Sequence, residues 1–275
     1  MEEPQLTSPG VVRDVLAQLG IRPLKRLGQN FLIDRRLRDR IVLGLALEDG
    51  DRVVEIGPGL GAITQGLAAA RCDVRAIEID RALAGHLRTF FGDRVTVLEE
   101  DALAADLPAL LGPRGKLVGN LPYYISTALL AAALAARPAI AVLMLQSEVA
   151  DRLAARPGSP ERGALTLLRE YHADLEPWAR AGSGQFYPPP KVASQVIRLR
   201  PHDPPAQAPW AVLRPVVAAA FGYRRKTLAR ALQEGLGIAP GTAVRALNLA
   251  GIEPARRGET LTLAEFDRLA LSLET

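Results

Sequence analysis

The residues best suited to chemistry in this chain are Asn120-Leu121-Pro122-Tyr123-Tyr124, which follow an apolar run. A flat nucleobase with an exocyclic amine needs hydrogen-bond acceptors for that nitrogen and an aromatic face on which to stack. The Asn120 side-chain oxygen, the Leu121 carbonyl and the Tyr123 ring would supply them. The same stretch is also compatible with an ordinary proline turn followed by a packing tyrosine. A cofactor site and a surface for nucleic acid elsewhere in the chain would favour the base-binding interpretation.

A glycine-rich segment, Glu55-Ile56-Gly57-Pro58-Gly59-Leu60-Gly61, lies between a predicted strand and a predicted helix. Gly57 and Gly59 permit a sharp turn and let a ligand lie against the backbone, although a turn without a ligand would use the same residues. The spacing differs from the G-x-G-x-x-G fingerprint of dinucleotide sites. The segment therefore predicts a nucleotide-type site that does not read a pyrophosphate.

Acidic residues end the next two predicted strands. Glu78 ends the second strand, where a carboxylate can accept hydrogen bonds from both hydroxyls of a ribose. Asp101 ends the third strand and can accept from an adenine amine, while Ala102 leaves room for the ring. A ribose and an adenine without a pyrophosphate favour S-adenosylmethionine, and an NAD-dependent oxidoreductase is the alternative at the level of the fold.

The elements that must position these residues alternate between β-branched runs and helical segments, which indicates a parallel α/β sheet. The predicted strands are 53–56, 74–79, 95–98, 117–119 and 140–145, with helices at 62–70 and 81–91 between them and two late strands at 174–178 and 192–199. Right-handed crossovers make this a doubly wound, mostly parallel sheet of the Rossmann-like kind, whose ligands bind beyond the carboxyl ends of the strands. The site residues all fall at such ends.

We expect three parts in the chain. Residues 1–50 hold N-terminal helices, one of them capped by Asp34, and a loop at 25–32 that covers the cofactor. Residues 51–203 form the Rossmann-like domain, and residues 204–275 form a small helical RNA-binding domain that is helical from Trp210 onward, with interruptions at 235–241 and 251–258.

Composition excludes several classes. The 275 residues are 48% hydrophobic and include one cysteine, Cys72, so no intramolecular disulfide forms and a reducing cytoplasm is expected. The three histidines are not at metal-ligand spacing, and we expect no metal site. The acidic N-terminus does not resemble a signal peptide, and the longest apolar stretch, 125–145, is interrupted by Arg137-Pro138, so we expect no membrane association.

Positive charge is clustered although the formal net charge is only +4. The segment Phe221–Thr227 contains Arg224-Arg225-Lys226 and is predicted to begin a helix that contacts RNA phosphates. Its alternative is a solvated helix face. Lys191, which follows three prolines, is also expected to contact RNA.

The motifs EIGPGLG, IEID, EEDAL and NLPYYIS, in this order, resemble the class I S-adenosylmethionine-dependent methyltransferases. Together with LGQNFL, LQSEV, FYPPPKV and FGYRRKTL, they are similar to the small-subunit ribosomal RNA adenine N6,N6-dimethyltransferase family over nearly the whole chain. The resemblance implies dimethylation of two adjacent adenosines in a hairpin near the 3′ end of that RNA during ribosome biogenesis. It also implies a partner in the small ribosomal subunit, and we expect a monomer.

The resemblance implies a set of site residues as well. The cofactor would be held by the positions Asn30, Leu32, Gly57, Gly59, Glu78, Asp101, Ala102 and Asn120. The target adenine would be flipped out and stacked on Tyr123, with Phe186 packing on its other side. Three positions depart from the family's motifs, because Tyr124 replaces an asparagine, Ala128 a proline and Ser147 a lysine.

Two further functions are compatible with these motifs. A large-subunit ribosomal RNA adenine methyltransferase of the macrolide-resistance type would share the cofactor and base motifs, although FYPPPKV and FGYRRKTL favour the small subunit. A ribosome-assembly factor that acts mainly by binding would keep the RNA surface and depend little on Asn120.

Overall fold

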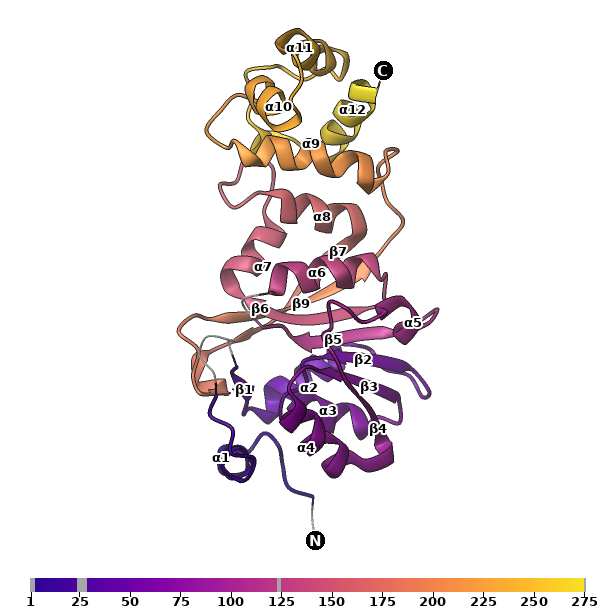
Figure 1. The fold of residues 1–275 in the computed structure, drawn as a ribbon, viewed down its shortest axis with the longest axis vertical. Helices are drawn as coiled ribbons and strands as arrows, with labels where there is room; N and C mark the ends of the chain where they lie inside the picture. Colours follow the sequence, from indigo (N-terminus) through magenta and orange to yellow (C-terminus); the bar gives the residue numbers. More distant parts are fainter. Residues whose placement is uncertain (1–2, 24–28, 123–124, 275) are drawn as a thin grey trace. The chain divides into compact units, whose positions relative to one another are not determined.

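The computed structural model of the chain describes residues 3–23, 29–122 and 125–274 (Figure 1). The chain forms two compact units, residues 1–150 with 175–201 and residues 151–174 with 202–275. We call them the sheet unit and the helical unit. The division into three parts, with boundaries after residues 50 and 203, stays a proposal.

The sheet unit contains a seven-stranded sheet in the order β4-β3-β2-β5-β6-β9-β7. Its strands are β2 (Arg52–Ile56), β3 (Asp73–Glu78), β4 (Val95–Glu99), β5 (Lys116–Asn120), β6 (Ala141–Gln146), β7 (Ala173–Ala181) and β9 (Ser194–Pro201). The strands from β4 to β6 pair in parallel, and β9 pairs antiparallel with β6. The predicted doubly wound, mostly parallel sheet is confirmed.

Helices cover both faces of this sheet because its strands are apolar on both sides. Val53, Val54 and Ile56 of β2 are all at most 2% exposed. The helices α2 (Arg35–Gly44), α3 (Ala62–Ala68) and α4 (Arg81–Phe91) lie on one face, and α5 (Leu107–Leu111) and α6 (Ser126–Ala135) lie on the other (Figure 1). From β2 to β4 the chain adds strands toward one edge of the sheet, and from β5 onward it adds them toward the other edge. A crevice is therefore expected where the neighbouring strands β2 and β5 end side by side.

Caps and apolar spacing explain where the helices begin. Asp80 precedes α4, and its Oδ1 accepts from the backbone N–H groups of Ala82 at 2.9 Å and Leu83 at 3.1 Å. Asp34 caps α2 in the same way, with Leu37 N donating to its Oδ1 at 2.7 Å. These bonds satisfy donors that the first turn of a helix leaves free.

The N-terminal part adds α1 (Pro9–Gln18) and a short strand β1 (Phe31–Leu32). The sequence predicts a loop over 25–32, whereas Phe31 and Leu32 pair antiparallel with β8 (Phe186–Tyr187). A two-residue strand has too few residues to show a period, so only its distant partner reveals it. Residues 25–28 lie outside the described part of the chain.

The helical unit is built from α8 (Ala164–His172), α9 (Trp210–Gly222), α10 (Leu228–Leu236), α11 (Pro240–Leu249) and α12 (Leu263–Glu274), and α7 (Ser147–Ala154) enters it. The prediction of helix throughout 210–234, with a helix beginning in Phe221–Thr227, is wrong in this segment, because α9 ends at Gly222 and the chain turns before α10 begins at Leu228. The N–H groups of Leu228 and Ala229 donate to Arg256 O at 2.7 Å and Pro254 O at 3.2 Å. A distant segment thus satisfies the first donors of α10, a signal that local sequence does not carry.

Within the described ranges, no helix is both long enough and apolar enough to cross a membrane.

Candidate cofactor and base-binding site

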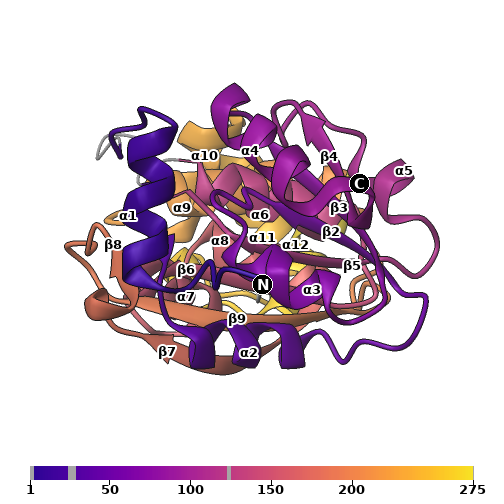
Figure 2. The same cartoon turned by 90° about the horizontal axis from the view of Figure 1, so that it is seen from below.

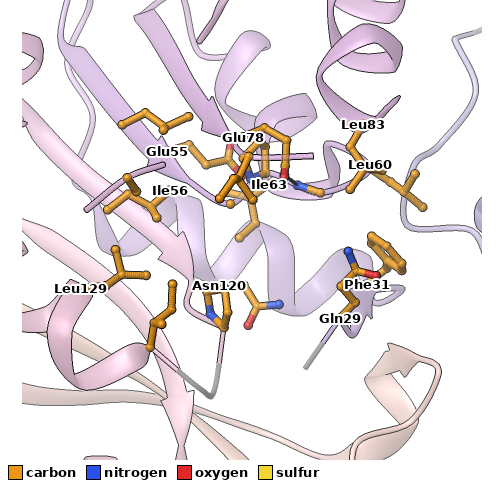
Figure 3. Close-up of a pocket in the computed structure, with 18 of the residues that line it drawn as sticks. Gln29, Phe31, Glu55, Ile56, Leu60, Ile63, Glu78, Leu83, Asn120 and Leu129 are labelled. Atoms are coloured by element: carbon orange, nitrogen blue, oxygen red, sulfur yellow. Dashed lines mark hydrogen bonds between the residues drawn. The ribbon is translucent and has the colours of Figure 1, made fainter. Parts of the chain in front are cut away.

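A cavity of about 210 Å³ opens at the carboxyl ends of β2, β3 and β5 in the sheet unit. Figure 3 shows Glu55, Glu78, Asn120 and Phe31 around it. Eight residues that the sequence predicts for the cofactor line this cavity: Asn30, Leu32, Gly57, Gly59, Glu78, Asp101, Ala102 and Asn120. The fold therefore brings the whole predicted set to one place, and the role of each residue stays a prediction.

Three N–H groups of the glycine loop have hydrogen-bond partners, two of them on β3 and one within the loop. Gly57 N donates to Ile77 O at 3.0 Å, Gly59 N to Glu78 Oε2 at 3.1 Å, and Gly61 N to Pro58 O at 2.9 Å. Gly61 has φ 89°, and a Cβ there would lie 2.8 Å from Phe91 Cε2. Because these three N–H groups have partners within the chain, they are not available to hold a pyrophosphate, as the loop of a dinucleotide site does.

Glu78 is buried at the end of β3, and both of its carboxylate oxygens accept from the backbone. Oε2 accepts from Gly59 N, and Oε1 accepts from Asp80 N at 2.9 Å. Burial raises the pKa of Glu78, and the two backbone donors oppose that rise. The side chain is held rigidly at the cavity wall, where each oxygen has a further lone pair for a ligand hydroxyl.

Glu55 lies beneath Glu78 and is 1% exposed. Burial raises the pKa of Glu55 to about 8, the Thr64 hydroxyl bonded to it at 2.7 Å lowers that pKa, and the nearby Glu78 charge raises it. The folded protein therefore keeps this carboxyl protonated at neutral pH. The sequence indicates no role for Glu55 beyond its place in the glycine segment.

Protonation of Glu55 predicts a pH-dependent stability. The folded protein holds the proton up to about pH 8, whereas the unfolded chain releases it near the ordinary value of 4.5. Between these two values the folded state binds a proton that the unfolded chain has released. The stability that this proton contributes is therefore complete below pH 4.5 and is lost as pH rises through 8. Urea unfolding measures the free energy of unfolding at pH 6 and at pH 8. Between these two values, wild type should lose on the order of 2 kcal/mol more of it than Glu55→Gln.

The exposed Glu100→Gln is the matched control for that experiment and should keep the wild-type pH dependence. An equal pH dependence of wild type and Glu55→Gln would show that Glu55 is ionised in the folded state.

Asn120 ends β5 and lines the cavity. Its Nδ2 donates to the backbone oxygen of Asn30 at 3.2 Å. This bond fixes the orientation of the amide and leaves Oδ1 as the acceptor on its other side. The first residue of the predicted base grip is therefore positioned by the N-terminal segment, which is 90 residues away in sequence.

The rim of the cavity contains large apolar residues for which no sequence motif indicated a role. Ile79 and Leu103 are 63% and 43% exposed although they are large and apolar. Phe31 lines the wall and contacts the glycine loop, since a Cβ on Gly59 would lie 3.2 Å from its Cδ1. Asp101 also lines the cavity, and its Oδ1 accepts from Leu103 N at 2.9 Å. A flat apolar ring with a polar edge is the ligand that such a rim suits.

The remaining residues of the predicted base grip have different surroundings. Leu121 is 1% exposed, and its N–H donates to Met144 O at 3.1 Å. Phe186 is 3% exposed in the hydrophobic core and does not line the cavity. Tyr123 and Tyr124 lie outside the described residues, so the predicted stacking stays a prediction.

The predicted RNA contacts lie in both units. Lys191 is exposed in the turn before β9 of the sheet unit. Arg224, Arg225 and Lys226 occupy the turn between α9 and α10, ahead of α10 and not inside it. Arg224 donates to the backbone oxygens of Pro160 and Arg162, and Lys226 pairs with Glu234 at 2.6 Å.

Metal chemistry has no candidate among residues 3–23, 29–122 and 125–274, because they hold no group of three or more histidine, cysteine, aspartate or glutamate residues suited to an ion.

Residues 22–273 match the sequence model of the protein family "Ribosomal RNA adenine dimethylase". The chain is 43% identical to the ribosomal RNA small subunit methyltransferase A of Pelotomaculum thermopropionicum, with 96% of each chain covered. It is 45% identical to the protein of the same name from Syntrophotalea carbinolica, with 90% of this chain and 96% of that protein covered.

Two solved structures share the fold. A dimethyladenosine transferase from Plasmodium falciparum has a TM-score of 0.71 at 22% identity and covers 88% of this chain and 97% of its own. The 23S rRNA methyltransferase ErmE has a TM-score of 0.66 at 28% identity, with coverage of 90% and 100%. The mostly parallel sheet with helices on both faces and a helical C-terminal region is thus the Rossmann-like fold of the class I methyltransferases.

Proposed function

Because the chain belongs to the ribosomal RNA adenine dimethylase family, we propose that it dimethylates the exocyclic N6 of two adjacent adenosines in a hairpin near the 3′ end of small-subunit ribosomal RNA. Relatives named as small subunit methyltransferases, 40% identical or more over nearly the full chain, carry this proposal. The activity would act during ribosome biogenesis in the cytoplasm, with the protein as a monomer.

The proposed cofactor is S-adenosylmethionine. Besides the protonated Glu55, three of the residues lining the described cavity are acidic, namely Glu78, Glu100 and Asp101, and none is lysine or arginine. An acidic site suits a sulfonium better than a pyrophosphate. The glycine loop, in which the N–H groups of Gly57, Gly59 and Gly61 are already bonded, supports the same choice over NAD.

Specific residues fit specific parts of that cofactor. Glu78 would accept hydrogen bonds from the ribose hydroxyls, and Asp101 would accept from the adenine amine. Ile79 and Leu103 would contact the two faces of the adenine, which explains why large apolar side chains are exposed there. Ala102 leaves space for the ring edge.

Asn120 would hold the target amine. The exocyclic nitrogen of adenine is a weak nucleophile because its lone pair is delocalised into the ring. When the Asn120 Oδ1 and the Leu121 carbonyl accept its two hydrogens, the nitrogen becomes pyramidal and its lone pair turns toward the electrophile. When bound, the cofactor would supply a methyl group whose bond to a positively charged sulfur breaks as the nitrogen–carbon bond forms, so that the sulfur leaves as a neutral thioether. As the nitrogen gains positive charge, the two oxygens stabilise it, and the proton leaves afterwards.

The function is tested with undermethylated small subunits and labelled S-adenosylmethionine. Mass spectrometry of the digested RNA should show N6,N6-dimethyladenosine at two adjacent positions. Absence of that nucleoside with small subunits would contradict the proposal.

A large-subunit activity is the second candidate, since ErmE is named a 23S rRNA methyltransferase and covers 90% of this chain. The same assay with large subunits separates the two. Methylation of large-subunit RNA alone would replace the first proposal with this one.

Glu78→Gln should weaken S-adenosylmethionine binding roughly 10- to 100-fold, because a hydrogen bond to a charged acceptor contributes about 1.5–3 kcal/mol. Isothermal titration calorimetry measures the loss. Glu99→Gln is the matched control, because Glu99 pairs with Glu78 in the register of the next strand but does not line the cavity. Equal affinities of Glu78→Gln and wild type would remove Glu78 from the cofactor site.

A further inference from the structure

A cluster of arginines surrounds Trp178 on the sheet unit, on the side where α2 lies along β7 and β9 (Figure 2). The Arg40 guanidinium lies 4.5 Å from the centroid of the indole ring, and that of Arg198 lies 5.1 Å from it. Cation–π contacts of this kind hold guanidinium groups in a fixed plane. We call Arg36, Arg40, Trp178, Arg180 and Arg200 the Trp178 surface.

The packing of α2 fixes the centre of this surface. The Trp178 Nε1–H donates to the backbone oxygen of Arg40 at 2.7 Å. Gly44 lets the ring approach the helix, since a Cβ there would lie 2.8 Å from Trp178 Nε1. The indole is thus held by a hydrogen bond and by close contact, and Arg40 is held above it.

The outer arginines extend the charge in two directions. Arg36 is one helical turn before Arg40 and therefore shares its face, while Arg180 is two residues after Trp178 on the same face of β7. Both are exposed. Among the described residues, neither Arg36, Arg40 nor Arg180 has a carboxylate within 4.0 Å.

The carboxylates within this cluster are already engaged. Asp39 lies 2.8 Å from Arg38 and 3.8 Å from Arg35, and Glu176 lies 3.7 Å from both Arg198 and Arg200. Exposed arginines on a helix are often only solvated. Here an aromatic anchor orders Arg40, and no acidic residue neutralises Arg36, Arg40 or Arg180, which leaves a fixed positive surface.

We propose that the Trp178 surface binds the phosphate backbone of the RNA substrate, outside the nucleotide that enters the cavity. The proposal rests on the proposed function and assigns a second RNA-binding surface, in the sheet unit, in addition to the predicted contacts of Arg224–Lys226 and Lys191. A planar guanidinium donates two parallel hydrogen bonds to a phosphate, and a rigid one loses little freedom on binding. An acidic protein would meet the same charges, but the proposed substrate is itself a polyanion, and so we favour RNA.

The experiment uses the full chain with Arg36→Glu and Arg180→Glu together. Binding to undermethylated small subunits and to deproteinised small-subunit RNA is measured at several salt concentrations. We expect the variant to bind both at least tenfold more weakly, and the slope of log K against log salt to become shallower by roughly 1.5, as two lost phosphate contacts require. The neutral variant, Arg36→Gln with Arg180→Gln, should weaken binding in the same direction by a smaller factor.

Arg13→Glu with Arg114→Glu is the control, because it makes the same charge change at exposed positions elsewhere in the sheet unit. Equal weakening by both pairs would reduce the effect to overall charge and overturn the proposal, as would unchanged binding. Weaker binding to subunits with unchanged binding to bare RNA would identify a ribosomal protein as the partner and also overturn it.

Cofactor affinity and wild-type methylation separate this proposal from the proposed function. Both arginine pairs should bind S-adenosylmethionine as wild type does. If wild type forms no dimethyladenosine, the proposed function has failed. If wild type is active and the Arg36/Arg180 and Arg13/Arg114 variants bind RNA equally well, only the proposal for the Trp178 surface has failed.

Discussion

Replacing Asn120 by alanine is expected to lower kcat/KM for methyl transfer by roughly 100- to 1,000-fold, a loss of about 3–4 kcal/mol of transition-state stabilisation. Alanine removes the Oδ1 acceptor that would turn the amine lone pair toward the electrophile. It also removes the Nδ2 donor that bonds Asn30 O at 3.2 Å. Single-turnover kinetics with undermethylated small subunits measures the effect.

Cofactor affinity is the second readout for Asn120→Ala. Glu78 and Asp101 remain in place, so the affinity for S-adenosylmethionine should fall by no more than about tenfold. Asn248→Ala, at an exposed position on α11, should behave as wild type. If the whole loss appeared in cofactor binding, Asn120 would be a cofactor ligand that does not hold the base.

Asn120→Asp separates the two bonds of the amide. It keeps acceptor oxygens toward the base but places a carboxylate oxygen against the Asn30 carbonyl. We therefore expect activity between those of wild type and Asn120→Ala. Wild-type activity of this variant would show that the bond to Asn30 does not position the side chain.

Replacing Arg162 by methionine is expected to destabilise the helical unit by roughly 3–5 kcal/mol, because it leaves partners of a buried charge unpaired. Arg162 is 0% exposed. Its Nη1 and Nη2 donate to the Glu170 carboxylate at 2.8 and 2.9 Å, and its Nε donates to Leu261 O at 3.0 Å. The single side chain connects α8 to the segment before α12 through bonds that water cannot replace.

Urea unfolding in a Trp178→Phe background measures this loss, because Trp210 is then the only tryptophan and lies in the helical unit, 5.3 Å from the Tyr171 ring. Arg35→Met is the control, since the Arg35 side chain is 69% exposed and its ion pair with Asp39 should contribute less than about 0.5 kcal/mol. A similar small change for both variants would mean that Arg162 is not the residue that holds these helices together.

The sequence by itself predicts the sheet and the residues around its ligand. Strand positions follow from short apolar runs between helical segments, and glycine, carboxylate and amide residues at the strand ends can be placed because parallel strands end at one edge. The observed sheet order brings Gly57, Glu78, Asp101 and Asn120 together for this reason. Each of these inferences needs only information from residues close together in the chain.

The tertiary structure decides what depends on distant partners. Pairing with β8 makes a strand of Phe31 and Leu32. The N–H groups of Leu228 and Ala229 donate to the carbonyls of Arg256 and Pro254, so α10 begins only at Leu228. The orientation of the Asn120 amide, the protonated state of Glu55 and the burial of Arg162 likewise arise from contacts across the fold. Burial and hydrogen-bond partners exist only once the chain is packed, and so no local pattern could contain them.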